Sequence, residues 1–165
     1  MKRVMIIGCP GSGKSTLARR LHQITGLPLV YLDRLYWNAD RTTVSKDEFR
    51  RRLIEAVADD EWIIDGNYSA TVELRLAACD TVVFLDYPVE VCLEGVRMRR
   101  GQVRPDMPWI ETDEDPEFTE FIRSFATERR PALLELLAQY NRDVHVFHDH
   151  AEADAFLRQL ELSLI

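Results

Sequence analysis

The most constraining feature of this sequence is the string GCPGSGKS at residues 8–15, close to the start of the chain. It matches the pattern G-x-x-x-x-G-K-[ST] at every fixed position. The glycines allow the backbone to curl so that several amide groups point at phosphate oxygens, and a helix that begins near the end of the string adds the positive end of its dipole. Lys14 can reach the β- and γ-phosphates of a nucleoside triphosphate, and the hydroxyl of Ser15 can ligate Mg²⁺. The string therefore predicts a phosphate-binding loop between a strand and a helix.

The flanking sequence supports this loop against the alternative of a chance match in a glycine-rich turn. An apolar run at residues 4–7 precedes the string, as expected of a buried strand, and Leu17, Leu21 and Ile24 follow it at helical spacing. Gly26 is suited to end that helix. We therefore expect phosphate contacts from the loop and from the first turn of the helix, namely Gly8, Gly11, Ser12, Gly13, Lys14, Ser15 and Thr16.

Short apolar runs alternate with helical patterns along the rest of the chain, which indicates an α/β fold with a parallel sheet covered by helices on both faces. The predicted strands are residues 4–7, 29–32, 62–64, 81–85 and 144–147. Ser45 followed by Glu48 is a capping box that begins one of the intervening helices. The chain has 165 residues and no internal repeat, so we expect a single domain over residues 1–165.

Acidic residues follow three of the predicted strands, at the edge of the sheet where ligands bind in folds of this class. Asp65 follows the third strand, where it could hold Mg²⁺ directly or through a water molecule; the alternative is an ordinary acid in a turn. Asp33 follows the second strand and could accept the proton of an attacking hydroxyl or hold the acceptor, or it could only cap a helix that begins near Leu35. Asp86 follows the fourth strand and is expected to cap the next helix.

An arginine-rich segment follows the fourth predicted strand. Four arginines lie within eight residues, namely Arg97, Arg99, Arg100 and Arg104. Arginines that close over a transferring phosphoryl group neutralise the charge on its oxygens, so we expect residues 97–116 to form a lid in which Arg100 and Arg104 act on the phosphates. The alternative is a solvated helix end whose arginines pair with the acidic residues that follow. A lid would have few apolar anchors, and its acidic residues, among them Glu111, would lie on the solvent side.

The composition limits the compartment and the partners. The chain has 28 acidic and 21 basic residues and a formal charge of −7, which argues against direct binding of DNA through its phosphates. The three cysteines, Cys9, Cys79 and Cys92, fit neither a disulfide framework nor a zinc site and indicate a reducing compartment. No apolar run approaches the ~20 residues needed to cross a bilayer, and the first apolar run is too short for a secretory signal. We therefore expect a cytoplasmic protein without a membrane partner.

A phosphate-binding loop does not by itself fix the reaction. The chain lacks the Asn-Lys-x-Asp motif expected of a guanine-specific switch, and it is shorter than most motors and assembly ATPases. Its size suits a small kinase that uses ATP and Mg²⁺ and transfers the γ-phosphoryl group to a small acceptor, such as a nucleotide or a nucleoside. The expected partners are therefore a nucleoside triphosphate and an unidentified acceptor. The alternatives are a nucleotide-binding regulatory protein with little turnover and a weak NTPase.

Several strings of the sequence resemble the bacterial DNA topology modulation proteins, which are related to adenylate kinases. The strings that carry the resemblance are MIIG ending at Gly8, YLD ending at Asp33, WIIDGNY at residues 62–68, FLDYP at residues 84–88 and RPDM at residues 104–107. The resemblance covers nearly the whole chain. It implies a three-layer P-loop NTPase fold of the nucleoside-phosphate-kinase type, with a five-stranded parallel sheet in the order 2-3-1-4-5 and a lid. It also implies that Asp65 holds a water ligand of Mg²⁺ and that Asp33 contacts the acceptor.

Overall fold

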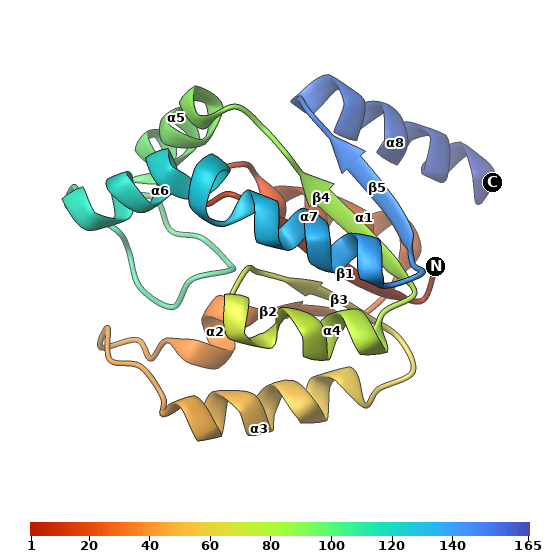
Figure 1. Ribbon diagram of the computed structural model, residues 1–165, viewed down its shortest axis with the longest axis horizontal. Helices are drawn as coiled ribbons and strands as arrows, with labels where there is room; N and C mark the ends of the chain where they lie inside the picture. The colour runs from red at the N-terminus through yellow and green to blue at the C-terminus, as the bar shows by residue number, and fades with distance from the viewer.

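The computed structural model describes residues 1–165 and is built around a five-stranded parallel sheet (Figure 1). The strands are β1 (Arg3–Gly8), β2 (Leu29–Tyr31), β3 (Trp62–Asp65), β4 (Thr81–Leu85) and β5 (Asp143–Phe147). They are arranged in the order β2-β3-β1-β4-β5, which confirms the predicted fold class and strand order. The central strand, β1, leads directly into the glycine-rich loop.

Helices connect the parallel strands and cover both faces of the sheet (Figure 1). The α-helices are α1 (Lys14–Thr25), α2 (Leu32–Tyr36), α3 (Lys46–Val57), α4 (Val72–Ala78), α5 (Val89–Arg99), α6 (Pro116–Glu128), α7 (Arg130–Gln139) and α8 (His150–Ser163), and a short 3₁₀-helix, η1, covers Ser69–Thr71. One face packs against α1, α5, α6 and α8, and the other packs against α3, α4 and α7. None of the helices is long and apolar enough to span a membrane.

The side chains of β1 explain why the sequence reads as a continuous apolar run. Successive residues of a strand point to opposite faces. Val4 and Ile6 therefore join one apolar cluster, and Met5 and Ile7 join the other. All four side chains are buried, because helices cover both faces of the parallel sheet.

The starts of two helices test the predicted caps. The Ser45 hydroxyl accepts a hydrogen bond from the Glu48 amide at 3.1 Å and caps α3, as expected. The prediction that Asp86 caps a helix is wrong, because Pro88 occupies the N-cap of α5. The Asp86 amide instead donates a hydrogen bond to the Phe147 carbonyl of β5 at 2.8 Å. The Asp86 carboxylate instead forms an ion pair with Arg130 at the start of α7, at 2.8 Å.

The second predicted strand is shorter than expected, and this changes the position of Asp33. The strand β2 ends at Tyr31, and Leu32 already begins α2. Asp33 thus lies in the first turn of this helix, whose N-cap is Tyr31. The alternative that Asp33 caps a helix beginning near Leu35 is therefore wrong.

Candidate active site

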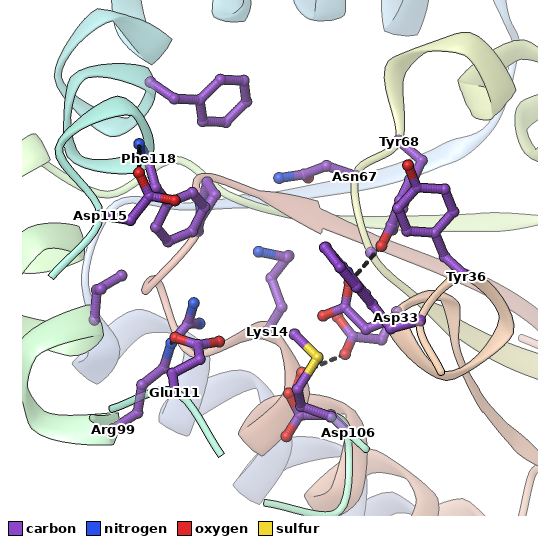
Figure 2. A pocket seen from close by; sticks show the side chains of 18 of the residues that line it. Lys14, Asp33, Tyr36, Asn67, Tyr68, Arg99, Asp106, Glu111, Asp115 and Phe118 are labelled. Carbon is purple, nitrogen blue, oxygen red and sulfur yellow. Dashed lines mark hydrogen bonds and ion pairs between the residues drawn. The ribbon is translucent and has the colours of Figure 1, made fainter. Parts of the chain in front are cut away.

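The loops at the carboxyl ends of β1, β2 and β3 line a cavity of about 770 Å³. Five of the site residues predicted from the sequence lie on its wall: Lys14, Ser15, Asp33, Asp65 and Arg100. Figure 2 shows the Lys14 ammonium in the middle of the cavity, with Asp33 on one side and Arg99 and Glu111 on the other. The cavity therefore brings together the lysine, the hydroxyl and both carboxylates that were predicted from widely separated strings.

The glycine-rich loop has the backbone conformation that its sequence predicts. Gly11 and Gly13 have φ angles of 85° and 95°, in the left-handed region that favours glycine, and Gly13 is the N-cap of α1. The Lys14 ammonium donates a hydrogen bond to the Cys9 carbonyl at 3.2 Å, so the side chain folds back across the loop. A Cβ atom on Gly11 would lie 2.0 Å from the Cys92 carbonyl oxygen, because α5 packs directly against the loop.

Of the other predicted phosphate-binding residues, three line a smaller hollow, whereas Gly8 and Gly11 line neither space. Ser12, Gly13 and Thr16 line a space of about 140 Å³ beside α8, together with Tyr87 and His150. The Ser12 hydroxyl is buried and has no hydrogen-bond partner. The loop therefore separates two recesses, of which only the larger contains the predicted acidic residues.

Ser15 and Asp65 form a pair of hard oxygen ligands at the end of β3. The Ser15 hydroxyl donates a hydrogen bond to Asp65 Oδ2, whereas Asp65 Oδ1 is buried without a partner. Burial raises the pKa of Asp65 to about 6, although the nearby Lys14 ammonium opposes this shift. No group of three or more His, Cys, Asp or Glu side chains could hold a metal ion. A hydroxyl and one carboxylate fit Mg²⁺, which keeps several water molecules and takes further oxygens from phosphates.

Asp33 lies between a tyrosine and the loop lysine. The Tyr68 hydroxyl donates a hydrogen bond to Asp33 Oδ1 at 2.6 Å. Burial raises the pKa of Asp33, whereas the Tyr68 hydrogen bond and the Lys14 charge lower it. The carboxylate therefore has one oxygen held by Tyr68 and a second oxygen, Oδ2, that can accept a proton or a hydrogen bond from a bound molecule.

A buried arginine that sequence reasoning missed holds the loop after β3. The guanidinium of Arg75, on α4, donates hydrogen bonds to the backbone carbonyls of Gly66, Asn67 and Tyr68. Burial lowers the pKa of Arg75 to about 9, which leaves the side chain charged at neutral pH. The same loop reaches β1, where Asn67 Oδ1 accepts a hydrogen bond from the Gly8 amide at 3.1 Å. The only signal in the sequence is a lone arginine within the otherwise apolar stripe of α4.

The segment between α5 and α6 has more anchors than expected. Asp106 is buried and pairs with Arg104 at 3.1 Å and with Arg19 of α1 at 3.5 Å. Met107 is also buried, and the ring of Trp109 packs edge-to-face against Trp37, with 5.5 Å between their centroids. The expectation of few apolar anchors is therefore wrong, because the RPDM string docks against α1 and the following tryptophan docks against the end of α2.

The placement of Glu111 corrects the expectation that the acidic residues of this segment lie on the solvent side. The Glu111 carboxylate contacts Arg104 at 2.7 Å and Arg99 at 3.4 Å, and it lines the cavity. The Gly101 amide donates a hydrogen bond to the Glu111 carbonyl at 2.6 Å, which closes the segment into a loop and returns Glu111 to the end of α5. The alternative that the arginines pair with the following acids is thus confirmed for Arg99 and Arg104.

The four arginines of the segment are directed differently. Arg99 and Arg100 line the cavity, and Arg99 lies close enough to Lys14 to lower its pKa, although burial lowers it more. Arg104 does not line the cavity and is instead held between Asp106 and Glu111. Arg97 points to solvent and pairs with Glu94. Of the two arginines predicted from the sequence to act on the phosphates, Arg100 lies on the cavity wall and Arg104 does not. Arg99, which was not predicted to have this role, also lies on the wall.

Comparison with known proteins places these features in a family, although no protein-family model matches the chain. The shikimate kinase of Mycobacterium marinum is 32% identical over 144 residues, which cover 78% of this chain and 73% of that enzyme. The adenylate kinases of Thermotoga petrophila and Thermotoga maritima are each 31% identical over 91 residues, or 53% of this chain. The match spans 40% of the length of these adenylate kinases.

Solved structures with the same fold cover almost the whole chain. A shikimate kinase from Bacteroides thetaiotaomicron superposes with a TM-score of 0.63 at 20% identity and covers 99% of this chain and 98% of that one. A shikimate kinase from Acinetobacter baumannii in complex with shikimate gives 0.63 at 21% identity, over 99% and 93% of the two chains. A gluconokinase from Sinorhizobium meliloti gives 0.52 at 16% identity, over 99% and 95%.

The sheet order and the glycine-rich loop after the central strand define a P-loop protein of the α/β class. The sequence similarity then specifies the family within this class. The chain belongs to the P-loop kinase family that includes shikimate kinase and adenylate kinase.

Proposed function

We propose that this protein is an ATP-dependent kinase that transfers the γ-phosphoryl group to a hydroxyl group of a small acceptor. The observation that carries this proposal is the meeting, in one cavity, of Lys14, the Ser15–Asp65 pair and the buried Asp33 carboxylate. A phosphate-binding lysine, a pair of metal ligands and a separate carboxylate are the groups that phosphoryl transfer to a hydroxyl requires. The family relationship supports the same reaction class.

The donor half of the site would hold the triphosphate and its metal. The proposed phosphate contacts are those predicted from the sequence, namely Gly8, Gly11, Ser12, Gly13, Lys14, Ser15 and Thr16. The free Oδ1 of Asp65 and the Ser15 hydroxyl would hold Mg²⁺. The bound ion would neutralise charge on the phosphate oxygens. The Lys14 ammonium, which hydrogen-bonds the loop carbonyl of Cys9 in the free protein, would turn to the β- and γ-phosphates.

The charge around Asp33 favours a hydroxyl over a phosphate as the accepting group. A phosphate acceptor would bring a dianion next to Asp33. In addition to burial, the negative charges of neighbouring carboxylates already raise the pKa of Asp33 and of Asp65, because Asp33, Asp65 and Asp106 lie close together. A neutral hydroxyl meets no such repulsion, and it can donate its proton to Asp33 Oδ2 while Tyr68 holds Oδ1. Asp33 would therefore orient the acceptor hydroxyl and take up its proton.

The segment 97–116 would act as the lid of this site. Arg99 and Arg100 lie on the cavity wall and would neutralise the transferring phosphoryl group. Arg104 is proposed to act indirectly, because it holds Glu111 and Asp106 instead of facing the cavity. This revises the direct role expected for Arg104 from the sequence.

Coupled measurement of ADP release tests the proposed reaction. The protein with ATP and Mg²⁺ is screened against hydroxyl compounds, nucleosides and nucleotides, with Lys14→Ala as the matched control. We expect ADP release that requires a hydroxyl acceptor and that is lost in the Lys14 variant. Release without an acceptor would favour the weak NTPase. Nucleotide binding without turnover would favour a regulatory protein, which the resemblance to the DNA topology modulation proteins also suggests.

A further inference from the structure

We propose that the acceptor half of the cavity is a slot for a planar aromatic ring, so that the acceptor is a neutral, nucleoside-like compound that carries its hydroxyl beside a heteroaromatic base. This inference rests on the proposed kinase function and names the substrate class of the same site. It is carried by two aromatic walls that face each other across the cavity.

The first wall comes from α2, the loop after β3 and the lid segment. Tyr36 packs edge-to-face against Trp37 and Tyr68, with centroid distances of 5.5 Å and 5.1 Å. Trp109 continues this wall beyond Trp37, and the guanidinium carbon of Arg41 lies 4.9 Å from the Trp109 ring centroid. All four aromatic side chains line the cavity and are only half-buried, so each keeps part of its ring accessible.

The second wall comes from α6. The rings of Phe118 and Phe121 are nearly parallel, with an interplanar angle of 5° and 6.5 Å between their centroids. Arg99 lies over Phe118 at 5.8 Å and Arg129 lies over Phe121 at 4.6 Å, so guanidinium groups extend this wall as well. Figure 2 shows Phe118 on the opposite side of the cavity from Tyr36 and Tyr68.

These walls fit a flat, conjugated ring better than a saturated polyol. Aromatic rings and guanidinium planes stack on nucleobases, whereas a saturated polyol has no flat face to stack on them. Two side chains of the first wall also keep a free hydrogen-bond donor. Asn67 uses its oxygen on the Gly8 amide, which leaves its amide nitrogen to donate, and Trp109 Nε1 has no partner. Two donors near an aromatic slot suit the carbonyl oxygens and ring nitrogens of a base.

The hydroxyl of such a compound would lie at the Asp33 end of the slot. Asp33 is adjacent to the first wall through its hydrogen bond with Tyr68. A cavity of about 770 Å³ has room for a nucleoside-sized acceptor beside the γ-phosphate. A 5′-phosphate on the acceptor would approach the carboxylate of Asp33, which is why the neutral nucleoside is the favoured form.

Calorimetry in the presence of saturating ADP and Mg²⁺ tests the slot, because the donor site is then filled. The probes are adenosine, guanosine, thymidine and uridine, together with ribose and adenosine 5′-monophosphate. Trp109→Leu and Phe118→Leu each remove one aromatic face, Trp109→Phe restores a ring, and Phe156→Leu removes an aromatic side chain that lies outside the cavity. Unchanged ADP binding shows that each variant is folded.

We expect at least one nucleoside to bind more tightly than ribose, and each of the two leucine variants of the slot to weaken its binding about tenfold. The Phe156→Leu variant should bind close to wild type, and Trp109→Phe, which keeps a ring but lacks the indole N–H, should bind more tightly than Trp109→Leu. Equal binding of ribose and nucleosides, no binding of any nucleoside, no effect of either leucine variant, or tighter binding of the monophosphate would overturn the proposal. ADP release with ring-free acceptors alone would overturn the slot but leave the kinase standing. Nucleoside binding in the slot without turnover would support the slot and overturn the kinase.

Discussion

At the scale of single residues, the buried carboxyl of Asp65 affects both the stability of the fold and the binding of Mg²⁺. Burial raises its pKa from 3.8 to about 6, so the folded protein holds a proton on this carboxyl more tightly than the unfolded chain does. This contribution to stability is fully present below about pH 4, where both states are protonated, and it is lost as the pH rises through about 6. At neutral pH the fold therefore contains a buried carboxylate that destabilises it and that Mg²⁺ can neutralise.

Replacement of Asp65 by asparagine should separate these two effects. Asp65→Asn keeps an oxygen for the Ser15 hydroxyl but removes the charge. In the absence of nucleotide we expect the variant to be more stable than wild type at pH 7.5, by up to about 3 kcal/mol, and the difference to disappear near pH 4. Urea denaturation across this pH range measures the effect. Parallel stability profiles for the two proteins would contradict the assigned pKa.

The same variant tests the metal role. Mg²⁺ should strengthen ATP binding to wild type above pH 6 and should strengthen it much less in Asp65→Asn, whereas metal-free ATP binding changes little. Calorimetric titrations with and without Mg²⁺ provide the comparison. If Mg²⁺ had the same effect on both proteins, Asp65 would not be a metal ligand.

The residues that could be predicted from sequence are those whose chemistry depends on local spacing. Lys14 and Ser15 follow from a contiguous motif, and Asp33 and Asp65 follow from their positions after apolar runs. Arg75 could not be recognised, because its role depends on three backbone carbonyls that the chain brings to it only in the folded state.

At the scale of elements, the contact between α5 and the phosphate loop depends on two glycines. A Cβ atom on Gly95 would lie 2.0 Å from the Gly11 carbonyl oxygen, and one on Gly11 would meet the Cys92 carbonyl at the same distance. The loop backbone and the helix backbone therefore touch directly. The position of the loop is consequently set by α5, whose last turn carries Arg99 to the cavity.

Alanine at Gly95 should displace this contact. In a helix interior glycine to alanine normally stabilises by ~1 kcal/mol, but here overpacking against the loop should give a net destabilisation of about 1–3 kcal/mol and weaker ATP binding. Met98→Ala, an exposed position on the same helix, is the matched control. Thermal unfolding and ATP titration of both variants measure the effect. An alanine at Gly95 that stabilises the protein would show that the close approach is absent in solution.

The Glu111 carboxylate forms ion pairs with Arg99 and Arg104. It should therefore compete with the triphosphate for these guanidinium groups. Glu111→Gln keeps the shape of the side chain and removes its charge. We expect it to tighten ATP binding about three- to tenfold, because charge-assisted hydrogen bonds to Glu111 no longer have to be replaced. Glu117→Gln, an exposed acid just beyond the segment and outside the cavity, is the control. Weaker ATP binding in the Glu111 variant would contradict this competition.

Hydrogen exchange tests whether residues 97–116 behave as a lid. The amides of Asp106 and Met107 should already be partly protected in the free protein, because both residues are buried. The rest of the segment should gain protection when ATP and Mg²⁺ bind, and gain more when a dinucleoside polyphosphate fills both halves of the site. Exchange that is the same in all three states would discard the lid.

At the scale of the whole molecule, the sequence predicts a sheet covered by helices on both faces, but it does not predict the order of the strands in that sheet. Buried apolar runs such as residues 4–7 and 81–85 predict strands with both faces covered, and the structure confirms this. The strand order came from family resemblance, because an apolar run does not specify its neighbours in a sheet. The inward position of Glu111 could not be predicted either, since it depends on a loop that closes through the Gly101 amide.

The fold brings a phosphate-binding loop and a carboxylate together, and we propose that this arrangement transfers the γ-phosphoryl group to a hydroxyl. Phosphorus NMR of the protein with ATP, Mg²⁺ and the best acceptor from the ADP-release screen tests it most directly. We expect the γ-phosphate resonance to be replaced by one new phosphomonoester resonance for each ADP formed, and we expect Lys14→Ala to form neither product. Inorganic phosphate as the sole product beside ADP, or no consumption of ATP with any acceptor, would contradict it.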